Sequence, residues 1–359
     1  MSISILLNSF RQKISWVTMR NLLRKCKLPI GNGWDNAIKT LETYKGEDIN
    51  DKIIELKKLY CEQIYVSEKA IKFFQLQEED ILTLIRLFQS YSIEKTIFQE
   101  TYPFPLPEEN LKTTDLVPSL VEIKETDENL ILVFCTRRSF IEQTQIDIKD
   151  FNTETQEKLV HYDKIIGKKK HIYQFFDVVV IWKHTNIVEL RIDIVNRASS
   201  QERDISFTAL LDKFNSLVSD KLKVEWRLNE SINLFTLINN LYKCNNEGKV
   251  IELRFVTDEG SMKSERMRKD KVDLRSETYH KAGKNAVDHI TPYHLTVLWD
   301  FPVSTKIETQ IELTLPGKVY HVNSLNPRLE EFIVQKCGLV EEYNFILNKI
   351  ITYLANVNQ

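Results

Sequence analysis

A dense run of charged side chains between Ser261 and Lys284 is the stretch of this chain best suited to hold an anion. It contains eight lysines and arginines against four acids, and no apolar run interrupts it. The basic residues are Lys263, Arg266, Arg268, Lys269, Lys271, Arg275, Lys281 and Lys284. Cations at this density can neutralise several phosphates and release their counterions, and Tyr279 and His280 could stack on bases. We therefore predict a nucleic-acid-binding surface in this basic segment, against the alternative of a solvated loop whose charges compensate one another.

A second group of basic residues lies at the N-terminus. Residues 1–34 carry six basic side chains and no acid, and the first acid is Asp35. Within an expected helix, the members predicted to extend the binding surface are Arg20, Arg24, Lys25 and Lys27. That helix, the break PIGNG and a following helix could form a helix-turn-helix that enters a DNA groove. Because the break is longer than the usual turn, a plain helical interaction domain is the favoured alternative.

Three side chains of a predicted hairpin could hold a metal ion and activate water. Asp177 lies on the first strand of this hairpin, and Glu189 and Arg191 lie on the second. The hairpin resembles in part the nucleases of the PD-(D/E)-x-K type, whose carboxylates hold Mg²⁺ and whose lysine activates water. Arg191 stands where that lysine is expected, and a guanidinium does not lose its proton at neutral pH. The favoured alternative is that Glu189, Arg191 and Asp193 form cross-strand ion pairs.

Composition and spacing exclude several other kinds of site. The seven histidines form no H-x-x-x-H or H-E-x-x-H pattern, so we predict no metal site. The nine glycines form neither G-x-G-x-x-G nor G-x-x-x-x-G-K-[ST], so we predict no nucleotide cofactor. The five cysteines are odd in number and widely spaced, which favours a reducing compartment. No signal-peptide pattern and no long apolar run is present, so we expect a cytoplasmic protein without a membrane span.

The elements that must position these residues change character along the chain. Residues 1–100 show helical spacing of apolar side chains, and the stretch SEKAIKFFQL at 67–76 is predicted as one of the helices. The stretch TYPFPLPEENLKTTDLVP holds four of the nine prolines, so a linker is predicted at 101–117. Beyond it the apolar period becomes two, which predicts antiparallel hairpins with packed helices. The chain is expected to close with one long helix, in which Gly338 is the expected point of a break. The sequence therefore predicts an α+β fold, with an N-terminal all-helical domain and a larger antiparallel-sheet domain over 118–359.

A short internal echo suggests that the sheet domain is built from two related units. IVELRI at 187–192 resembles VIELRF at 250–255. The pair Glu202-Arg203 matches Glu265-Arg266 at the same offset of 63 residues. Tandem units produce echoes of this kind, although two similar strands can also arise by chance. The predicted sub-units cover 118–220 and 221–359.

The order of parts resembles that of a known family. A helical domain, a proline-rich spacer and an antiparallel sheet follow one another as in the centromere-nucleosome-binding kinetochore subunits of the CENP-N kind. The local likeness is confined to the hairpin VEIKETDENLILVF. This resemblance assigns no residue a role.

The function that these residues favour is non-enzymatic binding of nucleic acid or of a partner protein through a basic surface. The formal net charge is −2 and the isoelectric point is about 6.4, so such binding must depend on local patches. The alternatives are a Mg²⁺-dependent nuclease and a structural or oligomeric protein-interaction subunit. Abundant lysine, isoleucine and asparagine suggest an AT-rich genome, which led us to predict an accessory protein of a prokaryotic antiviral defence locus.

Overall fold

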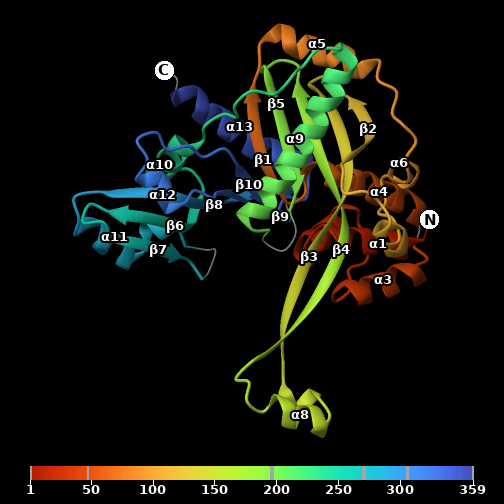
Figure 1. Cartoon of the computed structure of the whole chain (residues 1–359), viewed down its shortest axis with the longest axis horizontal. Helices are drawn as coiled ribbons and strands as arrows, with labels where there is room; N and C mark the ends of the chain where they lie inside the picture. Colours follow the sequence, from red (N-terminus) through yellow and green to blue (C-terminus); the bar gives the residue numbers. More distant parts are fainter. Residues whose placement is uncertain (1, 47, 195–197, 269–271, 305–306, 358–359) are drawn as a thin grey trace.

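A single antiparallel sheet of ten strands organises the chain (Figure 1). The computed structural model describes every residue except 1, 47, 195–197, 269–271, 305–306 and 358–359. The strands lie in the order β2-β3-β4-β5-β1-β10-β9-β8-β6-β7. Their bounds are β1 Lys69–Gln75, β2 Ser119–Glu125, β3 Asn129–Ile146, β4 Ile165–Trp182, β5 Ile187–Asp193, β6 Lys249–Thr257, β7 Met262–Arg266, β8 Ile290–Ser304, β9 Ile307–Leu315 and β10 Phe332–Gln335. An N-terminal helical region followed by a large antiparallel sheet with packed helices confirms the predicted α+β class.

The helices are concentrated at the N-terminus and between the strands. The α-helices are α1 Ile3–Arg11, α2 Trp16–Lys25, α3 Trp34–Thr43, α4 Ile49–Val66, α5 Glu78–Gln89, α6 Ile97–Thr101, α7 Glu108–Lys112, α8 Thr153–Leu159, α9 Ser200–Leu222, α10 Phe235–Lys243, α11 Thr278–Asn285, α12 Val319–Val322 and α13 Val340–Val357. Two 3₁₀ turns, η1 Ile148–Asp150 and η2 Leu274–Ser276, complete the described elements. Helix α9 begins with a capping box between Ser199 and Glu202.

The prediction of a helix at residues 67–76 is wrong, because this stretch forms β1. Strand β1 lies between β5 and β10, pairing antiparallel with both. Its side chains Ile71 and Phe73 enter the core on one face of the sheet, and Ala70 and Phe74 enter the core on the other. A strand that is buried on both faces has no polar alternation, so its sequence cannot be told from a short buried helix by apolar period alone.

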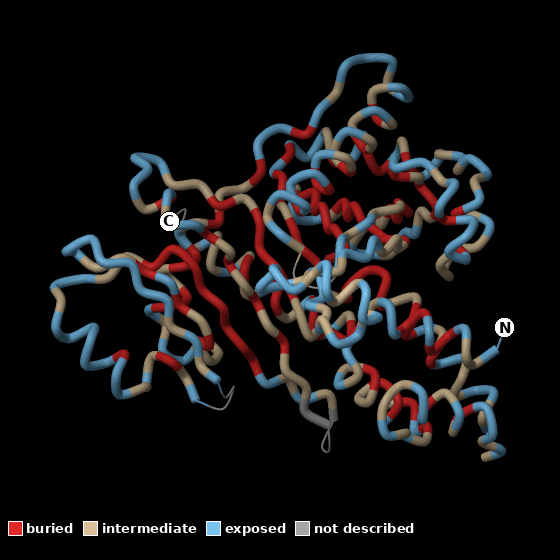
Figure 2. Tube along the Cα trace, turned by 60° about the horizontal axis from the view of Figure 1, so that its bottom comes forward, coloured by how far each residue is buried: buried red, intermediate tan, exposed pale blue. Residues whose placement is uncertain are grey.

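Helices cover both faces of the sheet, and a hydrophobic core lies against each face. On one face α5 and α9 meet through Phe88 and Phe214, whose ring centroids are 5.7 Å apart. On the other face the N-terminal helices α1–α4 pack together with α10 and α13. That second core also contains Leu106 and Leu111, so hydrophobic packing continues across the predicted linker at 101–117. Figure 2 shows the buried residues following the strands and the inner sides of the helices.

Strands β3 and β4 continue past the body of the protein as a two-stranded arm that ends in α8 (Figure 1). The two strands remain paired from Asn129 and Trp182 in the sheet to Ile146 and Ile165 at the tip. Near the base of the arm, the rings of Phe140 and Tyr173 stack with centroids 5.2 Å apart. The arm therefore depends mainly on its own backbone pairing and side-chain stacking.

The end of the chain differs from the single closing helix that was predicted. The break at Gly338 is present, but the residues before it form the short strand β10 and only those after it form α13. The two similar segments at 187–192 and 250–255 are both strands, but the similarity does not extend to the elements that follow them. Glu202-Arg203 lies in helix α9, whereas Glu265-Arg266 lies in strand β7. Strand β5 is buried along its whole length, whereas β6 is partly exposed and lies second from the sheet edge.

Candidate functional site

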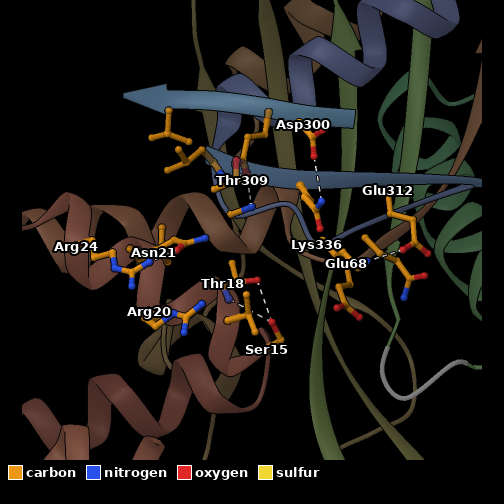
Figure 3. A pocket seen from close by; sticks show the side chains of 18 of the residues that line it. Ser15, Thr18, Arg20, Asn21, Arg24, Glu68, Asp300, Thr309, Glu312 and Lys336 are labelled. Atoms are coloured by element: carbon orange, nitrogen blue, oxygen red, sulfur yellow. Dashed lines mark hydrogen bonds and ion pairs between the residues drawn. The ribbon is translucent and has the colours of Figure 1, made fainter. Parts of the chain in front are cut away.

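A groove of about 950 Å³ lies between α2 and the part of the sheet formed by β6, β8, β9 and β10 (Figure 3). The stretch that follows β7 closes one side of it, and the turn before α13 closes another. The side chains that line it carry charges of both signs. The basic ones are Arg20, Arg24, Lys25, Arg266, Arg268 and Lys336, and the acidic ones are Glu68, Asp300, Glu312 and Glu342. The two basic groups predicted from the sequence therefore contribute to one groove.

Helix α2 forms one basic rim of the groove because one side of the helix is apolar and buried and the other side carries arginines. Ser15 caps the helix by accepting a hydrogen bond from the backbone N–H of Thr18 at 3.2 Å. The buried side of the helix holds its apolar residues, Met19, Leu22 and Leu23. Arg20 and Arg24 are one turn apart on the groove side, where Figure 3 shows them across from strands β8 and β9.

The two arginines of α2 keep unused hydrogen-bonding capacity. Arg24 Nη1 donates to Asn21 Oδ1 at 3.3 Å, a contact with a neutral partner. The Nε atom of Arg20 is buried and has no hydrogen-bond partner among the described residues. Neither arginine forms a direct ion pair with a described carboxylate. This rim therefore presents positive charge that the fold leaves uncompensated.

The opposite rim is formed by Arg266 and Arg268, on either side of the partly buried Met267. Arg266 Nε lies 3.7 Å from Glu252 Oε2, while 58% of the Arg266 side chain stays exposed. Arg254 donates to the same Glu252 at 2.8 Å. Because Glu252 is shared, it compensates Arg266 only in part. Arg268 is exposed and forms no direct ion pair with a carboxylate of the described chain.

The floor of the groove carries carboxylates that sequence reasoning missed. Asp300 Oδ1 accepts a hydrogen bond from Gln310 Nε2 at 3.0 Å, and Glu312 Oε2 lies 3.1 Å from Lys336 Nζ. Burial raises the pKa of Glu68 above its ordinary value, and the nearby Glu312 adds to that shift. Asp300 and Glu312 come from separate strands and Glu68 from the bend between α4 and β1, and nothing in their local sequence distinguishes them from surface acids.

Not every member of the predicted basic surface lies at the groove. Arg275 is 7% exposed and bonded to Asp273. Lys284 lies over the ring of Tyr242, 4.9 Å from its centroid. Five members of the predicted surface lie on the described chain but do not line the groove: Lys27, Lys263, Arg275, Lys281 and Lys284. Lys269 and Lys271 fall outside the described residues.

The two residues named as possible base contacts have different surroundings. Tyr279 is 75% exposed on α11. His280 is 2% exposed, and its ring lies between Tyr242, 2.9 Å from Nε2, and Glu265. His280 thus joins α11 to the neighbouring elements, so it cannot reach a ligand in this arrangement.

The possible nuclease residues do not share a site. Asp177 lies on the face of the sheet whose core is covered by α9. Glu189 and Arg191 lie on the opposite face, where Val180 is the cross-strand partner of Glu189 and Val178 that of Arg191. Asp177 accepts from the backbone N–H of Asp193 at 3.0 Å. Glu189 and Arg191 pair with each other at 2.8 Å and are almost completely buried. No group of three or more His, Cys, Asp or Glu in the described chain could hold a metal ion. The predicted cross-strand ion pairs are present for Asp193, which pairs with Lys69 on β1, whereas Glu189 and Arg191 pair along their own strand.

The fold and the groove define an α+β protein with a cation-rimmed groove on the face of its sheet that carries the N-terminal helices. No family model matches the chain, and no curated protein gives a match to it. Among the described helices, none has both the length and the apolar character needed to cross a membrane. All five cysteines are free thiols.

Proposed function

We propose that the protein is a non-enzymatic binding protein and that its groove holds nucleic acid. The observation that carries this proposal is the convergence of two basic groups that lie far apart in the sequence. Arg20 and Arg24 on one rim face the groove together with Arg266 and Arg268 on the other. Guanidinium groups are suited to phosphate because they donate in a planar, bidentate manner and stay charged at all ordinary pH values.

The charge of the groove favours an anion even though the whole chain is slightly acidic. Six basic side chains line the groove against four acids, and Glu342 is occupied by hydrogen bonds from the backbone N–H groups of Gly338 and Leu339. If each of the four rim arginines holds one phosphate, the logarithm of the binding constant should fall against the logarithm of salt concentration with a slope of about −3 to −4.

The test compares two double variants with the same change of charge. In one, Arg24→Glu and Arg268→Glu alter both rims of the groove. In the other, Lys263→Glu and Lys281→Glu alter exposed residues of the basic segment that do not line the groove. Fluorescence anisotropy with labelled single- and double-stranded DNA and RNA, at rising salt, measures the binding of each.

We expect the groove variant to weaken binding by about tenfold or more for each arginine, since a hydrogen bond to a charged group contributes roughly 1.5–3 kcal/mol. The control variant should change binding by much less. Equal losses in both variants would mean that the overall charge, and not the groove, binds the ligand. No binding by the unaltered protein at low salt would refute the proposal.

The same assay addresses the other predicted functions. Cleavage of the labelled strands in Mg²⁺ that is lost in Asp177→Ala would favour the nuclease, for which the geometry gives no support. Binding of a partner protein and the antiviral setting stay predictions.

A further inference from the structure

We infer that the groove accepts a single strand rather than a duplex and prefers bases that carry an exocyclic amino group. This inference rests on the proposed function and adds a ligand class to it. Its basis is the separation of charge within the groove. Three of the rim arginines, Arg20, Arg24 and Arg268, form no direct ion pair with a described carboxylate. The floor carries the acceptor side chains Glu68, Asp300, Gln310 and Glu312, together with Lys336, which is paired with Glu312.

This separation determines how a strand would lie. Phosphates are attracted to the rim arginines more than to the floor, because the floor lysine Lys336 is already paired with Glu312. The backbone therefore follows a rim, and the bases turn toward the floor. The groove also contains aliphatic side chains against which base faces can pack, Ile251, Met267 and Val303. Guanidinium groups of the rims offer further planar surfaces for stacking. In a duplex the phosphates lie outside and the base edges are already paired, so the floor would meet phosphates instead of bases.

The floor carboxylates are accessible enough to accept hydrogen bonds from a base. The Asp300 side chain is 31% exposed and that of Glu312 is 14% exposed. Each already has a basic partner, Lys249 for Asp300 and Lys336 for Glu312. A carboxylate has roughly four lone-pair sites, so such pairing leaves acceptor capacity.

Acceptors of this kind discriminate among bases. Adenine and cytosine present the amino groups N6 and N4 as donors, and acidic side chains are suited to accept from N4 of cytosine. Thymine and uracil instead present carbonyl oxygens beside their single ring N–H, and a carboxylate repels those oxygens. A strand of adenine or cytosine should therefore donate hydrogen bonds to the acceptor side chains of the floor, whereas a strand of thymine should not.

The experiment measures the affinity of the unaltered protein for dC, dA and dT tracts of equal length and for a mixed-sequence duplex. We expect dC and dA tracts to bind at least about fivefold more tightly than dT, in line with the discrimination that one good base contact provides. Equal affinity for all three tracts, or tighter binding of the duplex, would overturn this inference and leave the proposed function standing. No binding of any probe would overturn both.

A single variant tests the assignment of the preference to the floor. Glu312→Gln keeps the shape of the side chain but replaces one acceptor oxygen by a donor, which can serve the carbonyl oxygens of thymine. We expect dT to bind more tightly and the ratio of dC to dT affinity to fall toward one. The matched control is Glu225→Gln, which removes the charge of an exposed ion pair away from the groove and should leave the ratio unchanged. An unchanged ratio in the Glu312→Gln protein, with its unfolding transition intact, would show that the floor does not select the base.

Discussion

Arg275 and Asp273 form an ion pair in which Arg275 Nη2 lies 2.6 Å from Asp273 Oδ2. The same guanidinium donates to the carbonyl oxygen of Gly248 at 2.8 Å and to that of Leu241 at 3.3 Å. Arg275 therefore links the end of α10 to the residue that precedes β6. Its role is structural, although its sequence context is the same as that of the groove arginines.

Replacing Arg275 should destabilise the protein. In Arg275→Ala the carbonyl groups at the end of α10 lose their donor and Asp273 loses its partner, so the free energy of unfolding should fall by about 2–4 kcal/mol. Urea denaturation measures this loss. The matched control is Arg266→Ala, which removes a mostly exposed side chain and should cost less than about 0.5 kcal/mol. Similar stability of the two variants would contradict the structural role of Arg275.

The buried ion pairs of Asp193 should contribute strongly to stability. Asp193 pairs with Lys69, which is fully buried, and with Lys13 at 3.1 Å, and it accepts from the backbone N–H of Phe176 at 2.7 Å. Asp193→Asn leaves the two lysines without their carboxylate, so we expect a loss of about 3–5 kcal/mol in the free energy of unfolding.

The exposed pair between Asp35 and Arg11 provides the control for that measurement. Asp35→Asn should change the free energy of unfolding by at most about 1 kcal/mol, because water screens such pairs. If the Asp193 variant were no less stable than the Asp35 variant, the network around Asp193 would not hold the sheet and the N-terminal helices together.

The acid limb of the stability curve should also depend on Asp193. Burial alone would raise the pKa of this carboxyl, but Lys13 and Lys69 outweigh burial and hold its pKa below the ordinary value. The stabilisation is therefore complete above the pKa of the unfolded chain, about 3.9, and it is lost as pH falls through the lower folded pKa. Urea titrations at a series of acid pH values should show a shallower fall of stability in Asp193→Asn than in the unaltered protein. Parallel curves for the two proteins would be inconsistent with this assignment.

Binding to an anion should become stronger as the groove is acidified. Burial raises the pKa of Glu68, with Glu312 and Asp193 acting in the same direction and Lys336 against it. As pH falls through that raised pKa, Glu68 becomes neutral while exposed glutamates are still charged, so one repulsive charge disappears from the floor. Glu68→Gln should bind a labelled strand more tightly at neutral pH and lose this part of the pH dependence. The exposed Glu225→Gln should leave both unchanged, and weaker binding of the Glu68 variant would contradict the proposed position of the ligand.

The arm should be dispensable for folding. Between Thr144 and Gly167 its strands pair only with each other, and most of these residues are exposed. Replacing residues 144–167 by a short glycine-containing turn should therefore change the free energy of unfolding by less than about 1 kcal/mol, since a shorter connection costs little to close. Thermal and urea unfolding of the shortened protein give the comparison. A large loss of stability would mean that the arm packs on the body.

The sequence predicted the fold class but not every element. The hairpin that turns at residues 126–129 was recognisable because polar turn residues mark it locally. Strand β1 was not, because its neighbours in the sheet bury it from both sides, and Lys69 lies in that buried strand where a lysine is normally expected to be exposed. Strand β10 was not recognised either, because its four residues lie in a stretch that was interpreted as one continuous helix.

The groove could be predicted only in part. Its arginines were recognisable as basic groups, but their meeting depends on how α2 packs against a sheet built from distant strands. Arg275 and Arg268 have similar sequence surroundings, and only the carbonyl groups around Arg275 distinguish them. The three carboxylates of the floor come from three separate segments, so no spacing rule could have connected them.

The position of β1 has a consequence for synthesis of the protein. This strand is synthesised long before its partner on one side, β5, and longer still before its partner on the other side, β10. Until Phe332–Gln335 has been made, a nascent chain carries a bare strand edge that can pair with other chains. A message truncated ahead of that short segment would therefore yield an aggregation-prone product, and chaperones would need to shield the edge until the segment has been made.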